Sequence, residues 1–154
     1  SSSKNIGLYR ERAGAVIFLG RDSRTTEAMV SQAIAAARKV YSMPPAHGSL
    51  LAGRVLSSAQ LRGNWEEELK LICERINRLR VSFSDALKAN ASQDFSFIAA
   101  EKGMFSFLGL SVEQTRRLRS EHSLYMLDSS RINIAGLNEN NMERVVEAIH
   151  SVLE

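Results

Sequence analysis

The sequence predicts an α/β fold, because segments with the apolar pattern of strands alternate with segments that have the apolar period of helices. Residues 13–20 (AGAVIFLG) form a short, continuous apolar run, which is typical of a strand buried on both faces. Residues 58–90 instead repeat apolar side chains every three or four positions, as an amphipathic helix does. Of the 154 residues, 44% are hydrophobic, which is enough for a sizeable core.

The segments on either side of the predicted strand differ in character. Residues 1–12 contain Gly7 and several charges without a clear period, so we expect a loop there. Residues 23–40 are rich in alanine, and their apolar positions recur at helical spacing, which predicts a helix. Pro44 and Pro45 follow this helix and interrupt it, because each proline disfavours helical backbone in the residue before it.

The predicted helix over residues 58–90 is the longest element of the chain. Its charged residues mostly face away from the apolar stripe. Because a helix of this length does not fit in the middle of a compact small domain, we expect it to join two lobes. The stripe consists of Trp65, Leu69, Ile72, Ile76, Leu79, Phe83 and Leu87.

The pattern changes after the long helix. Residues 103–108, 123–127 and 131–135 have the composition of short strands. Residues 111–122 and 138–153 show helical spacing, and the first of these begins with a Ser-x-Glu entry. This order predicts a small α+β lobe at the end of the chain.

The distribution of charged and apolar residues argues against nucleic-acid and membrane partners. The formal net charge is +3, and the twenty Lys and Arg residues are spread along the sequence. The densest group, Lys70, Arg75, Arg78 and Arg80, is explained better by a solvated helix face. No apolar run approaches the roughly 20 residues that span a bilayer, and the first residues do not resemble a signal peptide.

The chain has a single cysteine, Cys73, which excludes an internal disulfide and favours a reducing compartment. We therefore expect a cytoplasmic location. Cys73 falls in the long helical segment, where we expect it to behave as a small buried hydrophobe. No metal site is predicted.

Three basic residues are candidates for chemistry, although each has an ordinary explanation. Lys4 alone would be read as a solvated charge, since an unperturbed lysine, with a pKa of about 10.4, is a poor nucleophile. Arg12 directly precedes the predicted buried strand, and Arg131 opens another strand. Either arginine could simply pair with a carboxylate.

A family resemblance changes this interpretation. Residues 1–14 (SSSKNIGLYRERAG) resemble the S-x-S-K-N-x-G-L-Y-x-E-R-x-G segment of class I aspartate and aromatic amino acid aminotransferases, and every fixed position of that segment is met. The resemblance continues along essentially the whole chain in the same order and spacing. The further matching stretches are residues 41–42, 44–48, 65, 68–69, 103–107, 109–110 and 131–136.

The resemblance implies a cofactor, pyridoxal 5'-phosphate, held by residues near the start of the chain. Lys4 matches the lysine that carries this cofactor as a Schiff base and later moves a proton as a general acid and base. Ser1, Ser3 and Arg12 match positions that hold the cofactor phosphate. Hydroxyl donors and a bidentate guanidinium suit a phosphate, which agrees with this assignment.

The resemblance also implies a substrate site shared between two copies of the chain. Arg131 matches the arginine that binds the substrate α-carboxylate, and Phe105 matches an aromatic residue near the substrate. Arg38 matches the arginine that reaches across the dimer interface to the distal carboxylate of dicarboxylic substrates, and Ser42 is a further residue expected to contribute from there. The implied assembly is therefore a homodimer. From the residues alone, Arg38 would be a cation favoured by the helix dipole, and Phe105 a core residue.

The implied fold is the C-terminal part of a fold type I transferase that depends on pyridoxal phosphate. Residues 1–58 would be a remnant of the large cofactor-binding domain, including the end of its α/β/α sheet. Residues 59–90 would form a long interdomain helix, and residues 91–154 a small α+β domain. The implied activity moves an amino group between an L-amino acid and a 2-oxo acid. Aspartate and glutamate are the first choice of substrate, because Arg38 favours a distal carboxylate, and aromatic amino acids come second.

Two departures and one absence qualify the resemblance. Ser130 stands where the family usually has glycine, and Met43 where asparagine is frequent. The aromatic residue that stacks on the cofactor ring and the acidic residue that protonates its nitrogen come earlier in the family and do not occur here. We therefore expect this chain to be nearly inactive alone and to act as part of a longer polypeptide. The alternative is a non-catalytic α+β interaction module derived from an aminotransferase tail.

Overall fold

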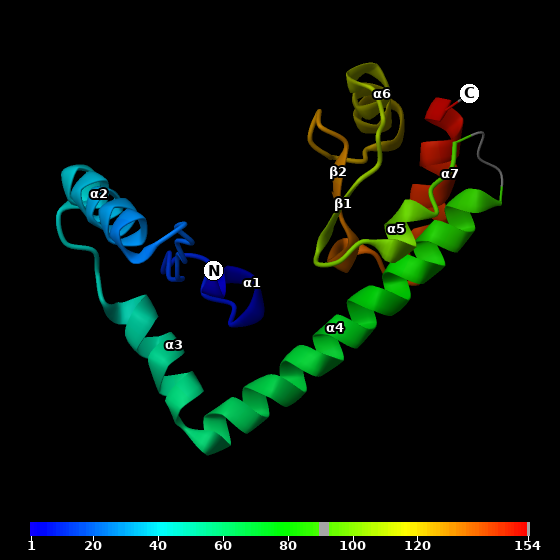
Figure 1. The fold of residues 1–154 in the computed structure, drawn as a ribbon. Coiled ribbons are helices and arrows are strands. Elements are labelled where there is room, and N and C mark those ends of the chain that lie inside the picture. The colour runs from blue at the N-terminus through cyan, green and yellow to red at the C-terminus, as the bar shows by residue number, and fades with distance from the viewer. Residues whose placement is uncertain (90–92, 154) are drawn as a thin grey trace. The chain divides into compact units, whose positions relative to one another are not determined.

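The computed structural model describes residues 1–89 and 93–153 and divides them into two compact units, Ser1–Leu69 and Lys70–Glu154. Figure 1 shows the order of the elements. Helices predominate, and the sheet that the described residues form has two antiparallel strands, β1 and β2. None of the helices in the described ranges is both long and apolar enough to cross a membrane.

The first unit contains α1 (Ser2–Asn5), α2 (Ser23–Tyr41), α3 (His47–Ser57) and the beginning of α4 (Ala59–Lys88). The predicted helix over 23–40 and the break at the two prolines are confirmed. The prediction of a loop over residues 1–12 is wrong for α1. This single helical turn is capped by the Ser1 side chain, and it has no apolar periodicity that would have predicted it. Helix α3 was not predicted, because its glycines and the preceding prolines are typical of a break.

The predicted strand over residues 13–20 does not form, and the segment has no regular secondary structure. Its apolar side chains are exposed, with Val16 at 77%, Ile17 at 84% and Leu19 at 89% of their full accessibility. A strand needs a neighbour to bond its backbone, and the sheet among the described residues lies in the other unit. The end of a large α/β/α sheet is therefore not built within the described part of this chain.

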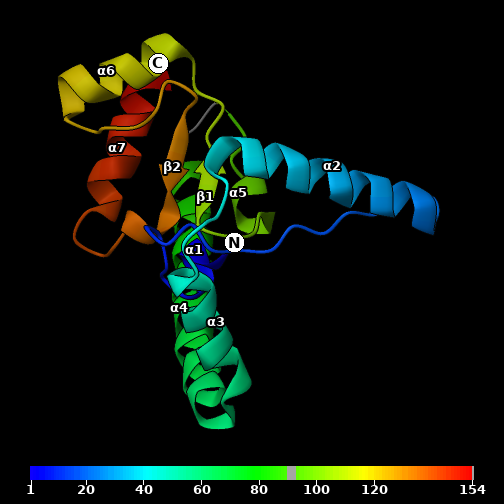
Figure 2. The same cartoon turned by 90° about the vertical axis from the view of Figure 1, so that its left-hand side faces the viewer.

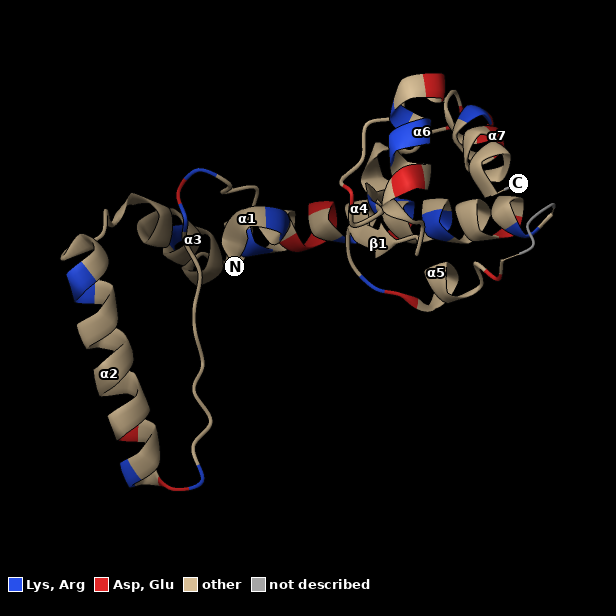
Figure 3. Ribbon diagram, turned by 90° about the horizontal axis from the view of Figure 1, so that it is seen from above, with Lys and Arg blue, Asp and Glu red and all other residues tan. Residues whose placement is uncertain are grey.

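Helix α2 begins at a well-formed cap. Asp22 has extended backbone, and its carboxylate accepts a hydrogen bond from the Thr25 backbone N–H at 2.7 Å. This bond from Thr25 holds the pKa of Asp22 below the ordinary value of 3.8. None of the residues of α2 is buried, and Figure 3 shows that charged residues lie mainly near its two ends. The Asp22 cap therefore satisfies a backbone N–H group at the exposed start of α2.

We predict that Asp22→Ala will fray the start of α2, because the Thr25 N–H loses the carboxylate that caps it. The carboxylate form is favoured in the folded helix, so its contribution is present above pH 3.8 and lost as the pH falls through the lower folded pKa. Amide hydrogen exchange over residues 23–27 at pH 6 should be faster in the variant. Asp22→Asn, which keeps an acceptor, should preserve protection; equal protection in all three proteins would contradict the prediction.

The long predicted helix is confirmed as α4, which has thirty residues. Its apolar stripe is buried only in its second half, where Ile76, Phe83 and Leu87 enter the core of the second unit. Ile72, earlier in the stripe, is half exposed. Cys73 is also exposed, so the expectation of a buried cysteine is wrong. The reason is that the core residues of the second unit contact α4 from Ile76 onward.

The second unit adds α5 (Phe97–Ala100), β1 (Phe105–Phe107), α6 (Val112–His122), β2 (Arg131–Asn133), a 3-10 turn (Ile134–Gly136) and α7 (Met142–Leu153). Strands β1 and β2 are antiparallel, with Phe105 opposite Asn133 and Phe107 opposite Arg131. Figure 2 shows the two strands beside each other. Two of the three predicted strands and both predicted helices are thus confirmed, although α7 begins later than expected.

Residues 123–127, predicted as a strand, are irregular. Their backbone bonds to α6 instead of to a sheet: the Leu124 N–H donates to the Leu118 carbonyl at 3.0 Å, and the Met126 carbonyl accepts from Arg119 at 3.0 Å. Ser123 has left-handed backbone and ends α6. The apolar alternation in this segment therefore reflects packing against the core and not strand pairing.

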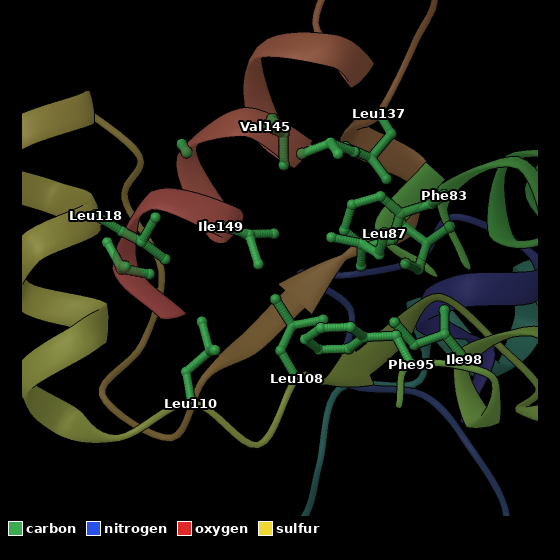
Figure 4. Packing of buried hydrophobic residues seen from close by; sticks show 14 of the residues in the cluster. Phe83, Leu87, Phe95, Ile98, Leu108, Leu110, Leu118, Leu137, Val145 and Ile149 are labelled. Atoms are coloured by element: carbon green, nitrogen blue, oxygen red, sulfur yellow. The ribbon is translucent and has the colours of Figure 1, made fainter. Parts of the chain in front are cut away.

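The core of the second unit is formed by side chains of α4, α5, α6, α7 and the segments around the strands (Figure 4). A capping box at Ser111 and Gln114 fixes the start of α6, and the Gln114 side chain also donates to the Val152 carbonyl of α7. The fully buried apolar side chains are Phe83, Leu87, Phe95, Ile98, Leu108, Leu118, Ile134 and Ile149. This core supports the two strands that carry Phe105 and Arg131.

Candidate active site

Lys4 lies on the single turn of α1, which also contains Ser3 and is capped by Ser1. The Ser1 side chain caps the turn by accepting from the Ser3 N–H at 3.3 Å, and the two hydroxyl oxygens are 3.0 Å apart. The Lys4 ammonium lies over the Tyr9 ring, 4.1 Å from its centroid. Tyr9 therefore contacts the Lys4 ammonium, an interaction that sequence reasoning did not anticipate.

Arg12 belongs to the same group through Tyr9. Its Nη1 donates to the Tyr9 carbonyl at 3.0 Å. Its backbone is left-handed, with φ of 51°, which is unusual for a residue other than glycine and costs on the order of 1–3 kcal/mol. Ser1 and Ser3 are thus in contact with each other, and Lys4 and Arg12 each contact Tyr9, so the four predicted cofactor residues lie on one short folded segment.

The turn that carries Lys4 is fixed by close backbone contacts. Ser2 N–H donates to the Ala13 carbonyl at 2.9 Å, and a side chain at Gly14 would come within 3.0 Å of the Ser1 Cα. Trp65 donates from its indole to the Asn5 carbonyl at 2.6 Å. These contacts hold residues 1–14 as one folded segment, so the position of Lys4 is set by the backbone on both sides.

Helix α3 contributes a second support. A side chain at Gly48 would come within 2.6 Å of Glu11 Cβ and 3.0 Å of Ala13 Cβ, so only glycine permits this approach. His47 Nδ1 is 2.9 Å from the Glu11 carboxylate. The matching stretch at residues 44–48 therefore packs against the segment that ends in Arg12 and Ala13.

Arg131 and Phe105, both predicted near the substrate, come together in the second unit. Arg131 is the first residue of β2, and its guanidinium carbon lies 4.7 Å from the centroid of the Phe105 ring on β1. A cavity of about 510 Å³ beside them is lined mainly by apolar side chains, including Leu124, Met126 and Leu137. A guanidinium at the edge of an apolar hollow is suited to binding the carboxylate of an organic acid.

Ser130, which replaces the usual glycine, has left-handed backbone with φ of 59°. The residue is buried, and its hydroxyl accepts a hydrogen bond from the Gly109 N–H at 3.0 Å. Its carbonyl accepts from the Leu108 N–H at 3.1 Å. The serine thus adds a bond to the end of β1 that glycine could not make, and this bond offsets part of the backbone strain.

We predict that Ser130→Ala will destabilise the fold more than Ser130→Gly. Alanine keeps the left-handed strain and loses the bond to Gly109, whereas glycine loses the bond and relieves the strain. The difference in unfolding free energy should be about 1 kcal/mol, measured by urea denaturation. If alanine were as stable as glycine at this position, the strain argument would be wrong.

Arg38 and Ser42 lie at the end of α2. Arg38 is in the last turn and is exposed, and its carbonyl accepts from the Ser42 N–H at 2.9 Å. Ser42 is also exposed and has φ of 58°. The structure therefore places these two residues next to each other, on a helix end that is open to solvent. Among the described residues, no group of three or more His, Cys, Asp or Glu side chains is arranged to hold a metal ion.

Sequence reasoning missed the supporting residues. Tyr9 and Trp65 stand in the matching stretches, but their periodicity gives no hint that they contact Lys4 and Asn5. Arg80 was read as part of a solvated helix face, and that reading is wrong, because its side chain is only 1% exposed. Its spacing from Ile76 and Phe83 on the apolar face of α4 was the available signal.

Known proteins match nearly all of this chain. Aspartate aminotransferase from Escherichia coli is 47% identical over 154 residues, which cover 99% of this chain and 39% of that protein. The aromatic-amino-acid aminotransferase of Pseudomonas aeruginosa is 39% identical, with 99% and 38% covered. A crystal structure of the aromatic-amino-acid aminotransferase from Burkholderia pseudomallei, covalently bound to pyridoxal phosphate, aligns with a TM-score of 0.81 and 39% identity, covering 100% of this chain and 39% of that one.

The fold is part of a fold type I aminotransferase, as the sequence predicted. A family model described as aminotransferase class I and II matches residues 1–149, and the chain belongs to this family. The chain spans about two fifths of the length of the curated relatives that it matches.

Proposed function

We propose that this chain is part of an enzyme that moves an amino group between an L-amino acid and a 2-oxo acid. The observation that carries the proposal is that Lys4 and Arg12 both contact Tyr9: the Lys4 ammonium lies over the Tyr9 ring, and the Arg12 guanidinium donates to the Tyr9 carbonyl. Membership of the aminotransferase family supports the reaction class. The proposal applies to a protein that also supplies the remaining length of these relatives.

The cluster around Lys4 fits pyridoxal phosphate. The fit rests on the donor set: two hydroxyls 3.0 Å apart, a guanidinium and a primary amine on one folded segment. We propose that Lys4 binds the cofactor as a Schiff base, and that Ser1, Ser3 and Arg12 bind its phosphate. When bound, the cofactor supplies an aldehyde that condenses with amines, with release of water, and a ring that withdraws electrons. In the reaction, the freed Lys4 amine would accept and return the proton of the substrate α-carbon.

We propose that Arg131 binds the substrate α-carboxylate and that Phe105 limits the orientation of its guanidinium. The planar fork of arginine matches a carboxylate with two parallel hydrogen bonds, which fixes the direction of the adjacent carbon. The Arg131 guanidinium carbon lies over the Phe105 ring, 4.7 Å from its centroid, which supports this role for Phe105. Aspartate and glutamate are the proposed substrates, with aromatic amino acids as the second choice. The relatives include proteins named aspartate aminotransferase and proteins named aromatic-amino-acid aminotransferase.

We propose that the enzyme is a homodimer in which Arg38 and Ser42 act at the partner's site. The exposed end of α2 supports this role, because a guanidinium there is free to meet a distal carboxylate outside its own unit. We also propose a cytoplasmic location. A relative from Schizosaccharomyces pombe, 37% identical, is named "Aspartate aminotransferase, cytoplasmic".

The proposed function is tested with the full-length protein purified from its native source. Incubation with pyridoxal phosphate, reduction with borohydride and peptide mass spectrometry should place the pyridoxyl label on Lys4. Turnover of L-aspartate with 2-oxoglutarate should be measurable in the same preparation. A label elsewhere, or neither label nor turnover, would overturn the proposal and favour a non-catalytic interaction module.

A further inference from the structure

Arg80 is a buried cation whose role does not follow from the proposed cofactor or substrate contacts. It lies on α4 between the core residues Ile76 and Phe83, and its side chain is only 1% exposed. Burying a guanidinium is costly unless acceptors replace the lost water. The arrangement of those acceptors therefore indicates what the residue holds in place.

The acceptors of Arg80 all lie in the segment that leads into β1. Nη1 donates to the Ile98 carbonyl at 3.1 Å, to the Ser106 hydroxyl at 2.6 Å and to the Glu101 carboxylate at 3.1 Å. Nη2 donates to the carbonyls of Gly103 at 2.7 Å and Phe105 at 3.1 Å. One guanidinium thus binds residues 98–106 at five points.

The strand held in this way carries Phe105. Arg80 binds the Phe105 carbonyl directly, and it binds the next residue through the Ser106 hydroxyl, which in turn donates to Glu101 at 2.5 Å. The ring of Phe105 lies under the Arg131 guanidinium. Arg80 therefore sets the backbone position of the residue on which Arg131 rests.

The partner strand is tied to the same helix. Arg75, five residues earlier on α4, donates to the Ala135 carbonyl at 3.2 Å and to the Leu137 carbonyl at 3.1 Å, just after β2. Helix α4 therefore fixes both strands through arginines, and Arg80 is the buried one. Phe107 is paired with Arg131 across the two strands, so a shift of β1 would also move Arg131.

A stabilising role alone does not account well for Arg80. Apolar side chains can usually replace a buried ion pair without loss of stability. Glu101 is 34% exposed, so the pair is not sealed from water, and the Arg80 Nε has no hydrogen-bond partner among the described residues. What an apolar residue could not supply is hydrogen bonding from one group to five acceptors in one short segment. This geometry is suited to holding residues 98–106 in a fixed position.

We propose that Arg80 is a positioning residue for substrate binding, acting through Phe105 on Arg131. This inference rests on the proposed role of Arg131. It makes the binding of the amino acid, rather than the attachment of the cofactor, the property that depends on Arg80. Loss of one of the hydrogen bonds between Arg131 and the carboxylate would weaken binding roughly tenfold or more.

The test compares the Arg80→Lys variant with the wild type, both as the full-length protein. Lysine keeps the charge but cannot reach five acceptors. The KM for L-aspartate should rise roughly tenfold, while kcat and the pyridoxyl label on Lys4 change little. Arg78→Lys, on an exposed position of the same helix, is the matched control and should behave like the parent. Val152→Ala, a truncation of a buried core residue on α7, controls for general destabilisation.

A spectroscopic measurement tests the positioning itself. The Phe105 ring should shift the side-chain protons of Arg131 upfield in NMR spectra, and Arg80→Lys should reduce that shift, whereas Val152→Ala should not. An unchanged KM together with an unchanged Arg131 shift in Arg80→Lys would overturn the inference. So would a Val152→Ala variant with the same rise in KM. If the parent lacks the Lys4 label and turnover, the proposed function fails, and the NMR comparison still decides whether Arg80 positions Arg131.

Discussion

Lys4→Ala should lose the covalent cofactor label and at least about a thousandfold in kcat, because one amine both binds the cofactor and moves the proton. Each of these roles alone is large, since general acid–base catalysis by a placed side chain contributes roughly a hundred- to ten-thousandfold. The measurements are borohydride labelling and turnover of L-aspartate. Free cofactor should still associate through Ser1, Ser3 and Arg12, so the loss should lie in attachment and chemistry rather than in all binding.

Two controls separate the amine of Lys4 from its charge. Lys4→Arg keeps a cation that can lie over the Tyr9 ring but cannot condense with an aldehyde, so it should fold normally and remain inactive. Lys70→Ala removes an exposed lysine of α4 and should retain both label and activity. Substantial turnover by Lys4→Arg would show that the reactive amine lies elsewhere.

The helices could be predicted because their signals are local. The apolar period of α4 and the alanine-rich pattern of α2 determine helical backbone within each segment, and both were found in the expected places. Helix α3 was missed because Gly48 and Gly53 lower its helical propensity. Gly48 is explained only by its close approach to Glu11 and Ala13, a contact between segments that no local pattern contains.

The strands were predicted less well because a strand depends on a neighbour. Residues 13–20 and 123–127 have suitable composition, yet neither pairs within the described residues. The second of these segments bonds to α6, and the first is exposed. Arg131–Asn133 and Phe105–Phe107 do pair, because each meets the other. Composition alone could not separate these cases.

The sequence motif names candidate site residues but does not give their contacts. The motif at residues 1–14 points to Lys4 and Arg12 as candidates, while the contact of Tyr9 with both of them became clear only in three dimensions. Charge patterning misjudged Arg80, because a buried arginine and a solvated one look alike in a helical sequence. The spacing of Arg80 within the apolar stripe outweighs its charge, and that is the useful rule for such helices.

Arg131→Ala should reduce kcat/KM for L-aspartate roughly 150-fold, because truncation leaves the substrate α-carboxylate without its partner. This factor corresponds to a loss of about 3 kcal/mol of transition-state stabilisation. Most of the loss should appear in KM if the carboxylate contact is the same in the ground state and the transition state. Steady-state kinetics at several aspartate concentrations measure both parameters. The Lys4 label should survive, since Arg131 belongs to the other unit.

Variants of Arg131 and Phe105 together decide which property of the arginine matters. Arg131→Lys keeps the positive charge but loses the planar fork, so it should recover only a small part of the activity. Phe105→Leu keeps an apolar contact and removes the ring under the guanidinium. The cation–π contact that is lost contributes about 0.5–1 kcal/mol. If lysine restored full activity, charge alone would bind the carboxylate, and the directed geometry of β1, Phe105 and Arg131 would have no part in substrate recognition.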